Sequence, residues 1–195
     1  QEQEDPFLEW VLNALQFVED RSQLVIGGVI AIIAALVITE FVQGQRLTAR
    51  DEAAHLLFQV MLADGNGQMD QVLGTGQRLI DEYAGTPSAA HGMILLANRN
   101  YGVGRYDEAK RLYERYIAEY GDVEMLVFSA RTGIAACAEA QGDLQGAAAG
   151  YIAYADEHPN DRASAIALMD AARCYRLLGD PQQQRRLLDP VTHEF

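Results

Sequence analysis

The sequence is poor in basic residues and in cysteine. Its 195 residues include 15 Lys and Arg against 28 Asp and Glu, which gives a net charge of −13, and Lys110 is the only lysine. Nucleic-acid binding needs clustered Lys and Arg, so this balance argues against a nucleic-acid partner. The two cysteines, Cys137 and Cys174, form no CxxC motif. A disulfide-rich scaffold and a zinc ribbon are therefore excluded.

The sequence also lacks a recognisable catalytic or metal-binding set. The segment DGNGQMD at residues 64–70 begins like a calcium loop, but Met69 replaces the required glycine and Thr75 the bidentate glutamate. A glycine-rich turn explains this segment better. No Ser-His-Asp or Cys-His set can be nominated from spacing. We therefore expect no enzyme activity, no metal and no cofactor. The histidines share no ligand spacing; they are His55, His91, His158 and His193.

One long apolar run, LVIGGVIAIIAALVITEFV, occupies residues 24–42. As a helix rising about 1.5 Å per residue, it would be about 28 Å long, which is enough to cross the hydrocarbon core of a bilayer. The run predicts a single transmembrane helix. Gly27, Ala31 and Ala35 form a small-residue stripe that would allow close packing of another membrane helix. The alternative is that the stripe reflects only the frequency of Gly and Ala in membrane helices.

Residues 1–23 form an acidic leader. Apolar residues recur in it at helical spacing after Pro6, with Trp10 beside them. This predicts a juxtamembrane amphipathic helix lying at the membrane surface, and the alternative is an extension of the membrane helix itself. Arg21 precedes the span and Arg46 and Arg50 follow it, so the positive-inside rule favours a cytoplasmic C-terminal domain by one residue, which is too small a bias to fix the orientation.

From residue 46 onward the pattern is helical and repeats. Four glycines are spaced 37, 38 and 37 residues apart, and alanines and tyrosines recur at fixed distances from them, as in Ala109 and Tyr113, and in Ala147 and Tyr151. This period of helix, glycine turn and helix resembles the tetratricopeptide repeat. It implies an all-α solenoid of helical hairpins over residues 46–195, with a plain helical bundle as the alternative. The glycines are Gly67, Gly104, Gly142 and Gly179.

The repeats also predict a core, and the end repeats depart from the pattern. Gly76 stands where the middle repeats have tyrosine, and Leu188 stands there in the last repeat. Atypical end repeats are expected because they cap the stack. The tyrosines expected in the core are Tyr113, Tyr116, Tyr151 and Tyr154.

The whole layout resembles the ancillary subunit family of the bacterial Sec translocon. The resemblance lies in the pattern of FLEWVLNAL…LVIGGVIAII followed by a degenerate repeat domain. It implies a single-pass inner-membrane protein with a periplasmic repeat domain linked to chaperone handover. The block LIDEYAGTPSAAHGMILLANRNYGVGRYDEAKRLYERYIAEYG also resembles repeats of outer-membrane-assembly and envelope-division proteins.

The tetratricopeptide resemblance implies a groove lined by the first helix of each hairpin. There Asn98 would bond a peptide backbone, Tyr101 would pack, and Arg173 with Arg176 would meet acidic groups. The alternative is a groove that is solvated or filled by the protein's own segments. The groove residues are Leu57, Met61, His91, Asn98, Tyr101, Thr132, Glu139, Met169, Arg173 and Arg176.

Two functions follow from these patterns. The first is a non-enzymatic, membrane-anchored scaffold or accessory subunit that binds other membrane-complex subunits and lipid. The second is a periplasmic adaptor at the translocon that binds extended peptide segments of client proteins. Cys137 and Cys174 occupy equivalent places on neighbouring first helices. Because packed helix axes lie about 8–10 Å apart and a disulfide needs Cα atoms within about 7 Å, two free buried thiols are favoured.

Overall fold

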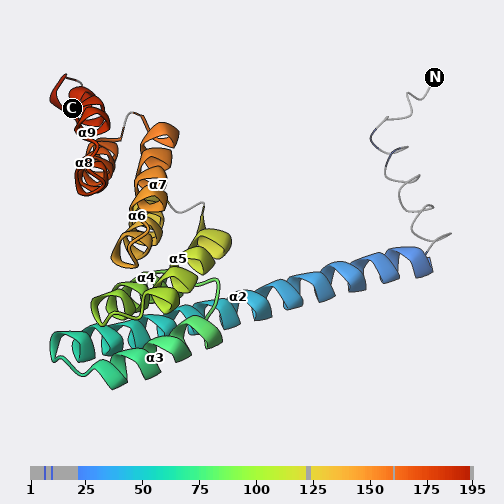
Figure 1. The fold of residues 1–195 in the computed structure, drawn as a ribbon. Helices are drawn as coiled ribbons and strands as arrows, with labels where there is room; N and C mark the ends of the chain where they lie inside the picture. The colour runs from blue at the N-terminus through green and yellow to red at the C-terminus, as the bar shows by residue number, and fades with distance from the viewer. Residues whose placement is uncertain (1–6, 8–9, 11–21, 122–123, 160, 194–195) are drawn as a thin grey trace, which may run out of the picture. The chain divides into compact units, whose positions relative to one another are not determined.

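The computed structural model describes residues 7, 10, 22–121, 124–159 and 161–193, and the regular secondary structure in these ranges is helical (Figure 1). The predicted leader helix at 1–23 lies almost wholly outside the described residues; Phe7 and Trp10 are exposed, with ring centroids 6.4 Å apart. The chain divides into two compact units, residues 1–48 and 49–195. The helices are α2 (Ser22–Gly65), α3 (Met69–Glu82), α4 (Pro87–Gly102), α5 (Tyr106–Tyr120), α6 (Glu124–Ala140), α7 (Leu144–Glu157), α8 (Arg162–Leu177) and α9 (Pro181–His193).

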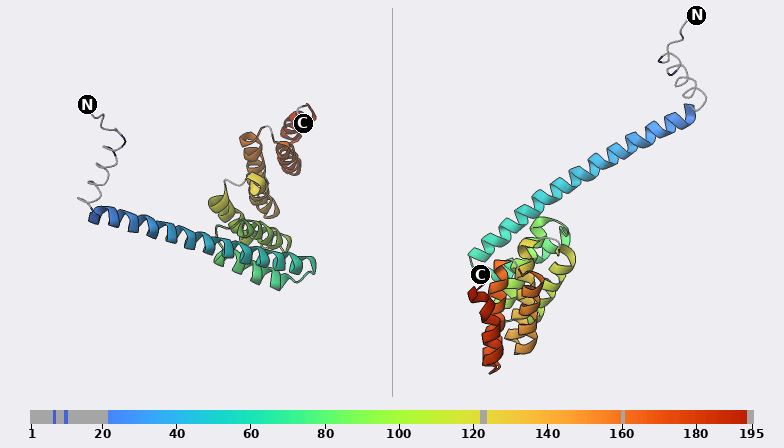
Figure 2. Two further views of the ribbon diagram at one scale, coloured as in Figure 1. Left: turned by 180° about the vertical axis from the view of Figure 1, so that it is seen from behind. Right: turned by 90° about the horizontal axis from the view of Figure 1, so that it is seen from above.

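Helix α2 contains both the apolar run and the first helix of the repeat domain. It continues without interruption from Ser22 to Gly65, and both views in Figure 2 show it unbroken. Residues 43–45, between the predicted membrane helix and the predicted repeat domain, lie within α2. No proline stands in α2, and Gly44 has no positive φ, so nothing in the backbone ends the helix there.

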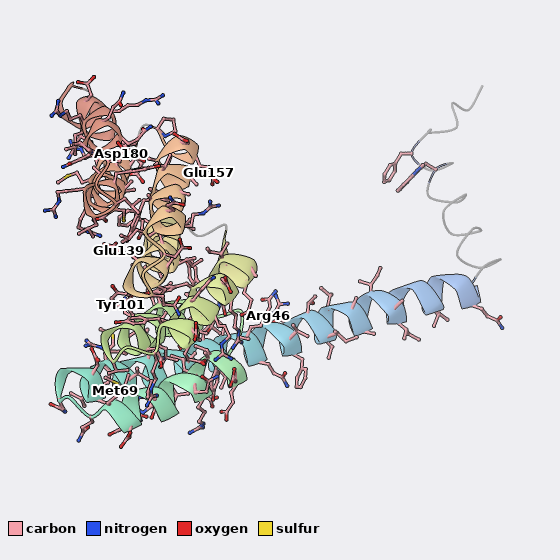
Figure 3. All side chains as sticks on the ribbon, in the orientation of Figure 1. Arg46, Met69, Tyr101, Glu139, Glu157 and Asp180 are labelled. Atoms are coloured by element: carbon pink, nitrogen blue, oxygen red, sulfur yellow. The ribbon has the colours of Figure 1, made fainter. Side chains whose placement is uncertain are left out.

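The two parts of α2 differ in burial. Between residues 26 and 48 every described side chain is exposed (Figure 3), including Ile32 at 63% and Phe41 at 65%. The hydroxyl of Thr39 donates to the Ala35 carbonyl oxygen at 2.8 Å, so this polar group is satisfied within the helix. Beyond residue 48, one stripe is buried against the repeat domain, at the helical spacing typical of an amphipathic helix. That stripe is Ala53, Leu56, Val60 and Ala63.

The four repeat glycines form the turns of four helical hairpins, as the spacing predicted. Each has φ between 70° and 90°, a conformation that favours glycine because it has no Cβ. At Gly104, the amide of the following Arg105 donates to the Asn100 carbonyl oxygen at 2.8 Å, and the same bond recurs after the other three glycines. This is the Schellman arrangement that ends a helix. The pairs are α2–α3, α4–α5, α6–α7 and α8–α9.

Tyrosines fill the core of the middle repeats, which confirms that prediction. Tyr113 is 3% exposed and Tyr151 is 2% exposed. Tyr113 needs a glycine opposite it, because a Cβ on Gly133 would lie 2.5 Å from the Tyr113 ring. The other two predicted core tyrosines, Tyr116 and Tyr154, are also buried.

The first repeat packs differently where its tyrosine is missing. Leu96 of α4 occupies the space over Gly76 of α3, and a Cβ on Gly76 would lie 2.7 Å from it. In the same contact, Leu79 of α3 lies over Gly92 of α4, where an added Cβ would be 2.6 Å from the leucine side chain. The departure from tyrosine at Gly76 is therefore matched by leucines that pack across the α3–α4 contact.

Both cysteines are free and buried. Cys137 lies on α6 and Cys174 on α8, at the equivalent positions that the sequence assigned them. Burial raises the pKa of each thiol to about 11. They behave as small apolar residues of the core.

Candidate partner-binding groove

Helices α4, α6 and α8 are the first helices of successive hairpins, and each contacts the next. Ten residues were predicted to line a groove along these helices and α2. Of those on α4, α6 and α8, three line one cavity, namely Asn98, Tyr101 and Thr132. Two more, Glu139 and Arg173, form an ion pair beside it. The others lie outside the cavity lining: Met61, His91, Met169 and Arg176 are exposed, and Leu57 is half-buried.

The cavity has a volume of about 280 Å³ and lies between α4 and α6, with walls from α5, α7 and α8. Tyr113 and Tyr151 were predicted as core residues, and their place in the cavity walls was not predicted. Five other lining residues were also not predicted. The repeat register could have found some of them, because Ala136 precedes its repeat glycine by six residues, as Asn98 does. The missed residues are Phe128, Ser129, Gly133, Ala136 and Asp170.

The two core tyrosines connect the core to the groove. The Tyr113 hydroxyl donates to Asn98 Oδ1 at 2.5 Å, and the Tyr151 hydroxyl donates to Glu139 Oε2 at 3.2 Å. Burial raises the pKa of both phenols above the ordinary value. They therefore remain protonated donors at neutral pH, and they fix the orientation of the two groove side chains.

Arg173 joins α8 to α6 through two hydrogen bonds to one carboxylate. Its Nε donates to Glu139 Oε1 at 3.0 Å and its Nη2 to Glu139 Oε2 at 2.7 Å. A third nitrogen, Nη1, donates to Asp170 Oδ1 at 2.5 Å. The hydrogen bond from Arg173 lowers the pKa of Glu139. Arg173 was predicted to meet acidic groups of a partner, whereas each of its three nitrogens donates a hydrogen bond within the protein.

The junctions between successive first helices are not alike. Arg99 of α4 forms an ion pair with Asp64 of α2, and Arg173 forms its pair across α6 and α8. Among the ion pairs of the described residues, none joins α4 to α6. The middle junction instead has the cavity and small uncharged residues, with Tyr101 and Glu139 at its edge (Figure 3).

Metal ligands do not gather in the part of the chain that the structure describes, where no group of three His, Cys, Asp or Glu residues is placed to hold an ion. The segment at residues 64–70 that resembles a calcium loop forms the end of α2, the turn at Gly67 and the start of α3. Asp64 pairs with Arg99 in this arrangement.

These hairpins, stacked through their first helices, define a class of protein: a helical-repeat scaffold for protein–protein interaction, a fold that is typically non-enzymatic. A family model described as a tetratricopeptide repeat-like domain matches residues 16–149. The chain therefore belongs to the tetratricopeptide repeat-like family. The match includes the apolar run as well as the first hairpins.

Solved structures have the same fold. The chain is similar to the nearly identical TPR-like repeats of a Podosopora anserina protein assigned as a kinesin light chain, with a TM-score of 0.59 and 19% identity over 72% of this chain and 73% of that one. A point variant of the same Podosopora anserina protein, solved separately, gives the same four values. At this identity the likeness shows the fold alone. A comparison with curated protein sequences finds no match.

Proposed function

We propose that this protein is a membrane-anchored accessory subunit of a larger complex in the bacterial inner membrane, with its repeat domain in the periplasm. Residues 24–42 would hold it in the bilayer, and the groove of the repeat domain would hold a protein partner. The proposal combines the scaffold fold with the unburied apolar run of α2, which is the observation that carries it.

The apolar run supports an anchor because nothing in the described part of the chain covers it. The helix is long and apolar enough to cross a membrane, with none of the most apolar stretch buried. Each large apolar side chain left in water forgoes about 1.5–3 kcal/mol of burial free energy. A run of such side chains requires an apolar environment outside the chain. The internal hydrogen bond of Thr39 suits that environment, since unsatisfied polar groups are costly in lipid.

The groove supports a protein partner because its side chains are ordered by the core. Tyr113 holds Asn98, and Tyr151 with Arg173 holds Glu139. Groups fixed before binding lose less conformational entropy when a partner arrives. We therefore propose that the groove contacts a protein segment rather than being filled by the chain itself.

A second candidate function is a peptide-binding adaptor at the translocon. It is favoured by the cavity of about 280 Å³, which is open to one side chain of an extended client segment. The two functions differ in the lifetime of the contact. A subunit stays in its complex, whereas an adaptor binds clients transiently and leaves.

The anchor and its docking role are tested by replacing Gly27, Ala31 and Ala35 with leucine. If the stripe packs against a partner helix, the bulkier side chains should release the protein from the complex while leaving it in the membrane. The matched control replaces Ile33 and Leu36, on the opposite side of the same helix, with alanine and should leave the complex intact. Complex size and membrane retention are read by native electrophoresis and by alkaline extraction. Complete retention of the triple variant in the complex would contradict the docking role.

A further inference from the structure

The cavity between α4 and α6 has walls that suit a positive charge. Four aromatic side chains line it, and the one charged residue in its lining is Asp170. The faces of aromatic rings attract cations, and so does a carboxylate. Neither arginine nor lysine lies among the residues that line it. The aromatic side chains are Tyr101, Tyr113, Phe128 and Tyr151.

The charges beside the cavity sum to minus one. Glu139 and Asp170 both bind the guanidinium of Arg173, so two carboxylates share one positive charge. The side chain of Asp170 is 27% exposed, which leaves it within reach of an incoming group. The net charge of −13 of the whole chain adds to the attraction at low ionic strength.

The size and the polar walls fit one side chain of a peptide. A volume of about 280 Å³ lies just below the range for small-molecule sites, which begins at about 300 Å³. Asn98 accepts the Tyr113 hydroxyl at its oxygen, so its amide N–H groups remain as donors. Asn98 is exposed and stands at the wall of the cavity. It can therefore donate to a backbone carbonyl next to the inserted side chain.

We propose that this cavity receives a lysine or arginine side chain from an extended segment of a protein partner. The inference rests on the proposed scaffold function and names the chemistry of the partner. It reverses the expectation drawn from sequence, in which arginines of the groove meet an acidic partner. The reason for this reversal is that Arg173 donates hydrogen bonds to Glu139 and Asp170 within the protein.

The test measures peptide binding to the full chain in detergent. The probes are fluorescent heptapeptides Gly-Ser-Val-Xaa-Val-Ser-Gly with Lys, Arg, Gln or Glu at the centre. We expect the Lys and Arg peptides to bind about fivefold or more tightly than the Gln peptide, and the Glu peptide to bind most weakly. Asp170→Asn should abolish the preference for Lys and Arg. The control Asp156→Asn makes the same charge change on an exposed site of α7 and should preserve it.

A second variant keeps the test valid if Asp170→Asn disturbs the fold. Ala136→Leu adds apolar bulk at the cavity wall without changing a charge, and it should weaken all four peptides. Circular dichroism checks that each variant is folded. Equal binding of the Lys and Glu peptides, tighter binding of the Glu peptide, or an unchanged preference in folded Asp170→Asn would overturn the proposal.

The peptide measurement also separates this proposal from the scaffold function. Peptide binding that ignores charge, together with an intact complex in native membranes, would overturn the cavity assignment alone. A preference for Lys and Arg in a protein that purifies from native membranes without any partner would overturn the scaffold function alone.

Discussion

The α4–α6 and α6–α8 junctions are formed by equivalent helices but are stabilised in different ways. At α6–α8, Arg173 binds Glu139 through two hydrogen bonds. At α4–α6, apolar side chains of both helices share one core cluster, and a cavity lies between the helices. Tyr113 of α5 packs against Gly133 of α6 in the wall of that cavity. The first junction is stabilised by an ion pair and the second by apolar packing. The cavity therefore lies at the junction that has no ion pair among the described residues.

The largest expected effect on stability comes from overpacking the contact between Gly133 and Tyr113, in the wall of the cavity at the α4–α6 junction. Gly133→Ala places a Cβ 2.5 Å from the Tyr113 ring, so the buried ring must move. Overpacking of this kind costs about 1–3 kcal/mol of unfolding free energy. Chemical denaturation of the full chain in detergent measures it. The control is Gly74→Ala, in the exposed interior of α3 with no atom near the new Cβ, which should stabilise the protein by about 0.5–1 kcal/mol. Equal effects of the two changes would contradict the packing at Gly133.

A smaller loss of stability is expected from removing the ion pair between α6 and α8. Arg173→Ala leaves Glu139 and Asp170 without their shared cation, and hydrogen bonds to charged groups are worth about 1.5–3 kcal/mol when buried. The side chain of Arg173 is 41% exposed, so solvent screening reduces the expected loss to about 1–2 kcal/mol.

The matched control for that change is Arg111→Ala, which removes an exposed pair with Glu108 within one helix. It should cost less than about 0.5 kcal/mol. If Arg111→Ala is as costly as Arg173→Ala, the α6–α8 pair has no special role. Arg173→Glu should be worse than Arg173→Ala, because it brings a third carboxylate to Glu139 and Asp170.

The pH dependence of stability also tests the Glu139–Arg173 pair, and the expected change in unfolding free energy is smaller. The pKa of Glu139 is lowered in the folded protein by the hydrogen bond from Arg173. Its contribution is therefore complete above the ordinary glutamate pKa of about 4.3 and is lost as the pH falls through the lowered value. Wild type should exceed Glu139→Gln in stability near neutral pH by at most about 1–2 kcal/mol, and the difference should shrink in acid. A difference that grows as the pH falls would have the wrong sign.

The smallest expected difference is between the reaction rates of the two thiols, Cys137 on α6 and Cys174 on α8. Cys137 and Cys174 are both buried, with pKa values of about 11. At pH 8 only about one thiol in a thousand would be ionised. Both should react with a thiol reagent far more slowly in the native protein than in denaturant, and at similar rates. Rapid native labelling of either one, resolved by single Cys→Ser variants, would show that its helix is less closely packed than described.

The sequence was sufficient for the hairpins because their signal is local. A glycine at Gly104 or Gly142 both permits a positive φ and marks the turn, so spacing alone gives the helix order. The buried positions of Tyr113 and Tyr151 follow from the same register. The continuity of α2 through residues 43–45 was not predicted, because neither the apolar run nor the repeat pattern extends over these residues.

The charged junction was missed for a different reason. Glu139 and Arg173 are 34 residues apart, and the sequence around Arg173 does not indicate which acidic residue lies opposite it. Two more arginine–carboxylate hydrogen bonds between helices have a similar separation, Arg115 to Asp81 at 34 residues and Arg99 to Asp64 at 35. A search for opposite charges separated by slightly less than one repeat would have found all three. The cavity depends on the shapes of side chains from five helices, so the repeat register could indicate some of its lining residues but not the cavity itself.

Gentle purification from native membranes tests the proposed function most directly. The tagged protein is extracted in mild detergent, washed, and its partners are identified by mass spectrometry. A scaffold subunit should remain bound to one defined set of membrane proteins in fixed proportion through the wash. Loss of those proteins on mild washing, with peptides still bound to the repeat domain, would contradict the account.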